Sequence, residues 1–156
     1  MGAPGCEPVR VRVAAIAMLE GGLVLVRHRA GPHTYHLLPG GGVEGGETLQ
    51  DALLREMREE TGLDVRLVRP LLLSDTIDTG RGRHIVNITF LTEVVGGHIT
   101  RKPLDGRVEA VEIVPPDALA ALDLRPPIAL VLAEAYANGF SGEARYLGSL
   151  WVDGPS

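Results

Sequence analysis

The chain has 156 residues, of which 45% are hydrophobic and 22% charged, and its formal net charge is −5. This length and balance predict one globular domain over residues 1–156, with a core over about residues 9–152. The negative charge excludes a general basic surface for a nucleic acid polymer, and the lack of an apolar run of about 18 residues excludes a membrane-spanning helix.

The N-terminal segment gives an expectation about the compartment. Cys6 is the single cysteine of the sequence, so no disulfide can form within the chain. Residues 1–10 lack the basic and apolar segments that are typical of a secretion signal. Together these features favour a cytoplasmic protein.

The first part of the chain alternates between predicted strands and turns. The expected strands cover residues 9–19, 23–26 and 36–38. Residues 20–22 predict a hairpin turn, and residues 30–35 predict a loop. Arg27 and Arg29 are expected at the end of the second strand.

The second part of the chain mixes strands with helices. The further expected strands cover residues 65–73, 84–95, 108–114 and 146–152, and polar loops are expected over residues 74–83 and 96–107. A short helix over residues 116–122 and a longer apolar helix over residues 127–138 complete the pattern. This order of elements predicts an α/β sandwich with a mixed β-sheet.

A helix of about four turns is predicted between the glycines at 45–46 and Gly62. At roughly 100° per residue, its apolar residues gather on one face. The members of that face are Leu49, Ala52, Leu53 and Met57. Glu56 and Glu60 fall within about 20° of the middle of the same face, and Glu59 lies beside them. The helix is therefore expected to point carboxylates toward the core.

Carboxylates in this position need a counter-charge. An unpaired buried carboxylate is costly, and three of them at i, i+3 and i+4 repel one another. Clustered hard oxygen ligands suit Mg²⁺ or Mn²⁺. The alternative is a solvated charged face with i,i+4 pairs to arginine, but the inward placement favours a metal site.

Residues 41–63 resemble the Nudix box of the MutT-like Nudix hydrolase family, whose pattern is G-x5-E-x7-R-E-U-x-E-E-x-G-U with U aliphatic. The fixed positions are matched by Gly41, Glu47, Arg55, Glu56, Met57, Glu59, Glu60, Gly62 and Leu63. The preceding residues 38–40 also resemble the usual lead-in of the family. His36 stands where the family often has Trp, which is expected to change packing or the substrate pocket but not the metal chemistry.

The resemblance implies the Nudix fold, an α/β/α sandwich with a mixed β-sheet and a loop-helix-loop catalytic box. It also implies the metal ligands. Carried over by position, Glu56 and Glu60 are the expected direct ligands, with Glu59 as a third and the backbone carbonyl of Gly40 as another. The expected cofactor is Mg²⁺ or Mn²⁺.

Further roles follow from the same resemblance. Glu47 is expected to hold Arg55 and shape the loop, or to reach the metal through water. Family members differ in the general base. Glu56 is one candidate, and Glu109 and Glu112 are candidates for a base or an extra ligand from a later segment, with a surface charge as the equal alternative.

Substrate contacts are expected from basic residues at strand ends and in loops. The candidates are Arg27, Arg29, Arg81, Arg83 and His84. Arginine suits bidentate phosphate binding, and Arg27 matches a place where family members often contact phosphate.

The remaining ring residues have less specific expectations. His28, His33 and His98 are expected to be solvated loop residues. Tyr35 and His36 are equally compatible with stacking on a nucleobase and with core packing.

The implied activity is metal-dependent hydrolysis of a phosphoanhydride in a nucleoside diphosphate linked to another moiety. A nucleoside triphosphate, an oxidised nucleotide and an ADP-ribose-type compound all remain open. The alternative is a non-catalytic Nudix-fold nucleotide sensor or regulator. The expected partner is a small nucleotide, with no nucleic acid polymer and no membrane, and a homodimer through a sheet edge or the helix over residues 127–138 is reasonable.

Overall fold

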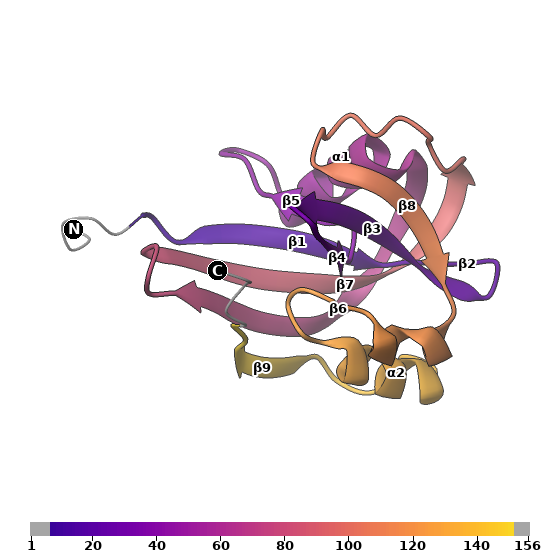
Figure 1. Cartoon of the computed structure of the whole chain (residues 1–156). Helices are drawn as coiled ribbons and strands as arrows, with labels where there is room; N and C mark the ends of the chain where they lie inside the picture. Colours follow the sequence, from indigo (N-terminus) through magenta and orange to yellow (C-terminus); the bar gives the residue numbers. More distant parts are fainter. Residues whose placement is uncertain (1–6, 152–156) are drawn as a thin grey trace.

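A five-stranded sheet runs through the middle of the computed structural model, which describes residues 7–151 (Figure 1). Its order is β5-β1-β7-β6-β9. The strands are β1 (Arg10–Ile16), β5 (Gly40–Gly42), β6 (Leu63–Asp78), β7 (Arg83–Gly97) and β9 (Arg145–Ser149). β1 pairs with β7 and β6 with β9 in parallel, whereas the β1–β5 and β6–β7 pairs are antiparallel. The predicted mixed sheet is therefore confirmed.

A smaller antiparallel sheet is built around a central strand. It consists of β2 (Met18–Leu19), β3 (Gly22–Ala30), β4 (His33–Leu37) and β8 (Val108–Val114). β3 pairs with each of the other three. The predicted hairpin turn between β2 and β3 is confirmed, because Glu20 and Gly21 adopt φ angles of 50° and 80°.

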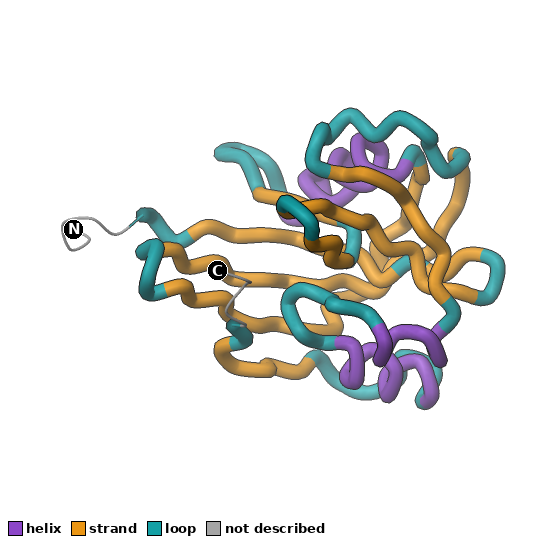
Figure 2. Tube along the Cα trace, in the orientation of Figure 1, coloured by secondary structure: helices purple, strands orange, loops and turns teal. Residues whose placement is uncertain are grey.

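Helices cover both faces of the five-stranded sheet (Figure 2). The helical elements are α1 (Leu49–Thr61), the 3-10 helix η1 (Pro116–Ala121) and α2 (Ala129–Ala137). Side chains of β1 alternate between two cores, as the pleat of a strand requires. Val13 and Ala15 pack in the core that contains Met57 of α1, whereas Ala14 and Ile16 pack in the core of η1 and α2. This arrangement is the expected α/β/α sandwich.

Several predicted boundaries were wrong. Residues 74–83 were expected to be a loop, but β6 continues to Asp78 and pairs with β7 up to Arg83. β3 extends to Ala30, so Arg27 and Arg29 lie within the strand, and β4 already begins at His33. Polar residues suggested loops here, whereas pairing with neighbouring strands satisfies the backbone of these segments.

Two expectations concern the ends of the chain. Cys6 and residue 152, the expected last residue of the final strand, lie outside the described residues. Within residues 7–151, none of the helices combines the length and the apolar character that a membrane crossing requires.

Candidate active site

Local signals at both ends fix α1, the helix of the carboxylate-rich segment. The Thr48 side chain accepts a hydrogen bond from the backbone N–H of Asp51 at 3.0 Å, which satisfies one of the free donors of the first turn. At the other end Gly62 adopts φ 79°, and its N–H donates to the Arg58 carbonyl. A Cβ on Gly62 would lie 2.4 Å from the His98 carbonyl oxygen. The helix therefore ends where only glycine fits.

The Glu60 side chain points inward from α1, as predicted. Glu60 is 2% exposed, and Leu53 and Met57 of the same face are fully buried. Its Oε1 accepts a hydrogen bond from the backbone N–H of Gly40 at 2.7 Å. Burial raises the pKa of Glu60 to about 7, although this hydrogen bond and the nearby charge of Arg12 act in the opposite direction. Leu49, expected on the buried face, is 37% exposed because it begins the helix.

Glu56 lies against the glycine turn that precedes α1. A Cβ on Gly41 would meet the Glu56 carboxyl carbon at 2.3 Å, so the absence of a side chain at this position makes room for the carboxylate. Burial raises the pKa of Glu56, whereas a 2.9 Å ion pair with Arg55 lowers it. Glu56 is thus a second partly buried carboxylate on the inward side of α1.

Arg55 holds the loop and the helix together. Its Nε and Nη2 donate to the two carboxylate oxygens of Glu47, both at 2.8 Å. Nη2 also donates to the Gly42 carbonyl at 3.2 Å. The bidentate hydrogen bonds with Arg55 lower the pKa of Glu47 to about 2. These bonds orient the guanidinium whose Nη1 contacts Glu56 and Glu59, at 2.9 and 3.3 Å.

Three further charged residues face this site and were not predicted. Asp105 lies in the loop between β7 and β8, and its charge contributes to raising the pKa of both Glu56 and Glu60. Arg107 binds Asp105 with contacts of 2.8 and 3.1 Å. Arg12 of β1 donates to the Leu38 carbonyl at 2.9 Å. These residues carry no signal in their own segments, because the site forms only when the loop and β1 meet α1.

The donor set fits a hard divalent cation that completes its shell with substrate. Within residues 7–151, no three His, Cys, Asp or Glu side chains gather closely enough to form a finished metal site. Glu59 is 38% exposed at its side chain and turns toward Arg55. Glu56 and Glu60 remain as partly buried oxygen donors, and Mg²⁺ is usually held by one or two carboxylates plus substrate phosphates. A cation between them would also relieve the cost of burying two carboxylates.

Arg27 and Arg29 lie on one side of β3, paired with the acidic residues of β8. Glu109 contacts both arginines, at 3.0 and 2.7 Å. Glu112 bridges Arg27 at 2.5 Å and His36 at 2.8 Å. The register of β3 and β8 shifts after Arg27, so Glu109 has no partner residue in the strand pairing and forms a β-bulge. A β-bulge changes the direction in which the nearby side chains point. The structure therefore groups both arginines with both predicted base candidates.

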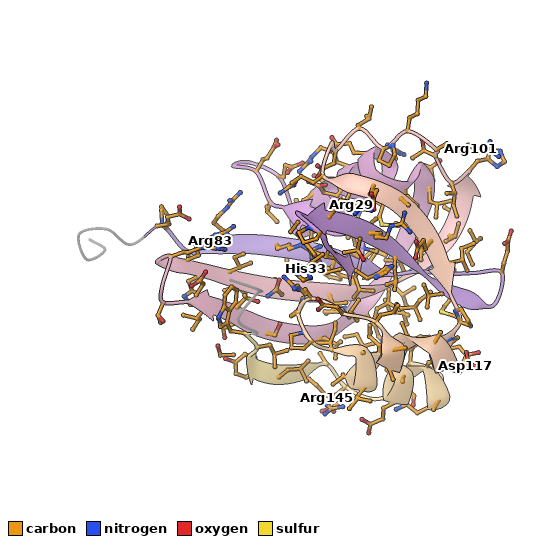
Figure 3. All side chains as sticks on the ribbon, viewed as in Figure 1. Arg29, His33, Arg83, Arg101, Asp117 and Arg145 are labelled. Carbon is orange, nitrogen blue, oxygen red and sulfur yellow. The ribbon has the colours of Figure 1, made fainter. Side chains whose placement is uncertain are left out.

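The other predicted substrate contacts lie elsewhere. Arg81, Arg83 and His84 are in and next to the turn that joins β6 to β7. His84 is paired with Asp75 of β6 at 2.7 Å. Figure 3 shows Arg83 well apart from Arg29. The predicted phosphate-binding residues therefore do not form one cluster.

A small cleft lies between the five-stranded sheet and the segment that leads into α2. Its lining includes Arg12, Ser74, Asn87, Thr89, Arg125 and Ile128. Ser74, Asn87 and Thr89 are buried polar residues on neighbouring strands. Arg125 stacks on the Tyr35 ring, with its guanidinium carbon 4.6 Å from the ring centroid. Arg12 joins the two regions, because it lines the cleft and its charge acts on Glu60 and Glu56.

Comparison with known proteins gives a family match over most of the chain. A family model for the NUDIX domain matches residues 8–135. An ADP-ribose pyrophosphatase from Methanocaldococcus jannaschii is 33% identical over 90 residues, which cover 57% of this chain and 53% of that protein. An RNA pyrophosphohydrolase from Marinomonas sp. is 42% identical over 55 residues, covering 35% of this chain and 34% of that protein. The chain thus aligns with about half, or less, of these curated relatives.

A solved structure shows the same fold. A NUDIX hydrolase from Nitrosomonas europaea matches with a TM-score of 0.73 at 24% identity, over 85% of this chain and 90% of that chain. The overall fold described above therefore recurs in a known structure.

Proposed function

The chain belongs to the NUDIX domain family, and from that premise we propose that it is a divalent-metal-dependent pyrophosphohydrolase. Its substrate would be a nucleoside diphosphate linked to another moiety, and the bond cleaved would be a phosphoanhydride. The expected ion is Mg²⁺ or Mn²⁺. The whole chain would act as one domain on a small nucleotide.

One observation carries this proposal. Glu60 is 2% exposed and its pKa is raised to about 7, yet it is fixed by a hydrogen bond from the Gly40 N–H. Glu56 lies on the same face with a pKa that burial also raises. Two such carboxylates on one face of α1 are suited to hold a cation.

Different residues of the chain would have different roles in the reaction. A bound divalent ion would neutralise phosphate charge and provide an activated water. Glu56 and Glu60 would hold it, and Arg55 would keep Glu56 in position through its bonds to Glu47. Arg12 and Arg107 would contribute positive charge beside the developing negative charge of the phosphates.

Asp105 is the residue that we place in the role of general base. It approaches Glu56 and Glu60 from a different segment, and its side chain is 19% exposed. Arg107 lowers the pKa of Asp105, so the carboxylate is ionised near neutral pH and can accept a proton from water. Glu109 and Glu112 instead pair with Arg27 and Arg29, a group that would suit the distal phosphate.

The cleft beside Arg12 would take the nucleoside. Its buried polar floor, made by Ser74, Asn87 and Thr89, offers hydrogen-bond partners to a base or ribose. The two curated relatives are named for ADP-ribose and for RNA, so both an ADP-ribose-type compound and a nucleoside triphosphate belong in the test.

The experiment is product release with Mg²⁺ across nucleoside triphosphates, 8-oxo-dGTP, ADP-ribose, diadenosine polyphosphates and nucleotide sugars. Glu60→Gln is the informative variant, and Glu93→Gln is its matched control because Glu93 is 57% exposed at its side chain, in an ion pair with Arg66 on β6. Turnover that is lost in Glu60→Gln and kept in Glu93→Gln supports the hydrolase. Tight nucleotide binding without turnover under Mg²⁺ and Mn²⁺ would favour a sensor instead.

A further inference from the structure

His28 is buried in β3, which makes its expected place in a solvated loop wrong. The residue is only 8% exposed. His28 Nε2 is also the sole buried side-chain nitrogen or oxygen within residues 7–151 that has no hydrogen-bond partner. An unsatisfied buried polar atom costs free energy, so it needs an explanation such as a ligand.

The imidazole faces the carboxylate site. Val24, on the same side of β3, packs in the core of α1, and alternation along the strand turns His28 to that side. The charges that act on His28 are those of Arg107, Asp105 and Arg12. The same three charges act on Glu60. His28 and Glu60 therefore share the same three charged neighbours, on the α1 side of β3.

The other ring nitrogen suggests which tautomer is present. The Tyr35 hydroxyl lies 3.5 Å from Nδ1, and the two rings meet edge to face with centroids 5.5 Å apart. Burial and the charge of Arg107 lower the pKa of His28, so the ring is neutral near neutral pH. If the Tyr35 hydroxyl donates to Nδ1, the proton of the neutral ring is on Nε2.

We propose that His28 is a substrate-binding residue whose Nε2–H donates a hydrogen bond to a non-bridging phosphate oxygen. The inference rests on the proposed function, since it assigns one phosphate contact of that same site. A donor in this position has no protein acceptor to compete with the ligand. It also adds no net charge to the site, unlike a lysine or arginine.

The loop between β7 and β8 supplies two of the charges that act on His28, those of Arg107 and Asp105. Arg107 is 79% exposed at its side chain and is bound to Asp105. A phosphate group bound at Nε2 would offer Arg107 a second anionic partner. Asp105 would be released for contact with water by this exchange of partners.

The test compares His28→Leu with His28→Gln, because glutamine can return an N–H near the position of Nε2. His33→Gln is the control, since His33 is an exposed residue of neighbouring β4. Losing a hydrogen bond to a charged oxygen should reduce kcat/KM by about tenfold or more, chiefly through KM. We expect His28→Leu to show this loss with an unchanged or higher Tm, and His28→Gln to recover most of the activity.

A binding measurement separates this proposal from the hydrolase itself. Mg²⁺ with imidodiphosphate, a non-hydrolysable phosphate-only probe, should shift the Nε2 resonance of His28 in ¹⁵N-NMR spectra and bind His28→Leu more weakly. That result supports the His28 contact even if no substrate in the panel is turned over. Unchanged kcat/KM in His28→Leu, or an unmoved His28 signal with the probe bound, overturns the contact while leaving the hydrolase in place.

Discussion

The backbone N–H of Gly40 donates a 2.7 Å hydrogen bond to Oε1 of Glu60, and this bond ties the glycine turn to the last turn of α1. The carboxylate is 2% exposed, so the single N–H replaces only part of the water that it loses. The site is thus built around a carboxylate that opposes folding when it is ionised.

The first prediction concerns stability in the presence of EDTA. The folded-state pKa of Glu60 is raised from 4.5 to about 7, so the folded state binds more protons than the unfolded state between these values. Stability is therefore fully present below pH 4.5 and should fall as pH rises through about 7. The shift corresponds to about 3 kcal/mol at most. Urea unfolding between pH 4 and 8 measures this slope.

Glu60→Gln should remove most of that pH dependence, because the amide does not ionise. Mg²⁺ at pH 8 should then raise the Tm of the wild type more than that of the variant. Equal slopes in the two proteins would show that other groups, such as Glu56, govern the pH dependence.

The second prediction concerns the space beside Gly41. In Gly41→Ala the new Cβ would lie 2.3 Å from the Glu56 carboxyl carbon, so the carboxylate must move. We expect kcat to fall by about 100-fold while stability falls by only about 1–3 kcal/mol. Gly45→Ala is the control, since nothing lies within 4 Å of the Cβ position there. Similar activities of the two variants would argue against a role for the Glu56 position.

The third prediction concerns the bond between Arg55 and Glu47. Lysine keeps the charge but cannot form both 2.8 Å contacts with the two Glu47 oxygens and also reach Glu56. Arg55→Lys should therefore lower kcat by about tenfold or more, with a smaller change in KM. Steady-state kinetics with Arg58→Lys as the control measure the effect, because Arg58 is 68% exposed at its side chain. A wild-type kcat in Arg55→Lys would mean that a positive charge at residue 55 is enough for activity.

The fourth prediction concerns Asp105. Asp105→Asn should reduce kcat by about 10²–10⁴-fold, the usual contribution of a general base. The pH–rate profile should also lose its acid limb, and that limb lies below the ordinary aspartate range in the wild type because Arg107 lowers the pKa of Asp105. Asp64→Asn, at an exposed ion pair with Arg58, is the matched control. An unchanged profile would assign the base to another carboxylate.

The helix and its carboxylates could be predicted from sequence because both depend on local spacing. The glycines at 45–46 and Gly62 bracket it, and the 3.6-residue period places Glu60 inward. The mixed sheet followed from the order of elements. The polar ends of β6 and β7 could not be predicted in this way, because a polar segment does not show in its own sequence whether a neighbouring strand pairs with it.

The rest of the site depends on contacts between distant segments. Asp105 and Arg107 sit in a loop whose composition indicates only a turn, and their proximity to α1 arises from folding. His28 lies between the basic residues Arg27 and Arg29 in the sequence, but the pleat of β3 turns its side chain to the opposite side of the strand. The β8 bulge at Glu109 likewise has no signature in the sequence.

Arg12 belongs to two regions at once: it lines the cleft and its charge acts on Glu60 and Glu56. A substitution that adapts the cleft to a different base at this residue would also change the charge felt by the carboxylates. A single substitution of Arg12 would therefore change both the cleft and the metal affinity of the carboxylates. Replacement of Ser74, Asn87 or Thr89 would instead change the lining of the cleft and leave the charge of the site intact.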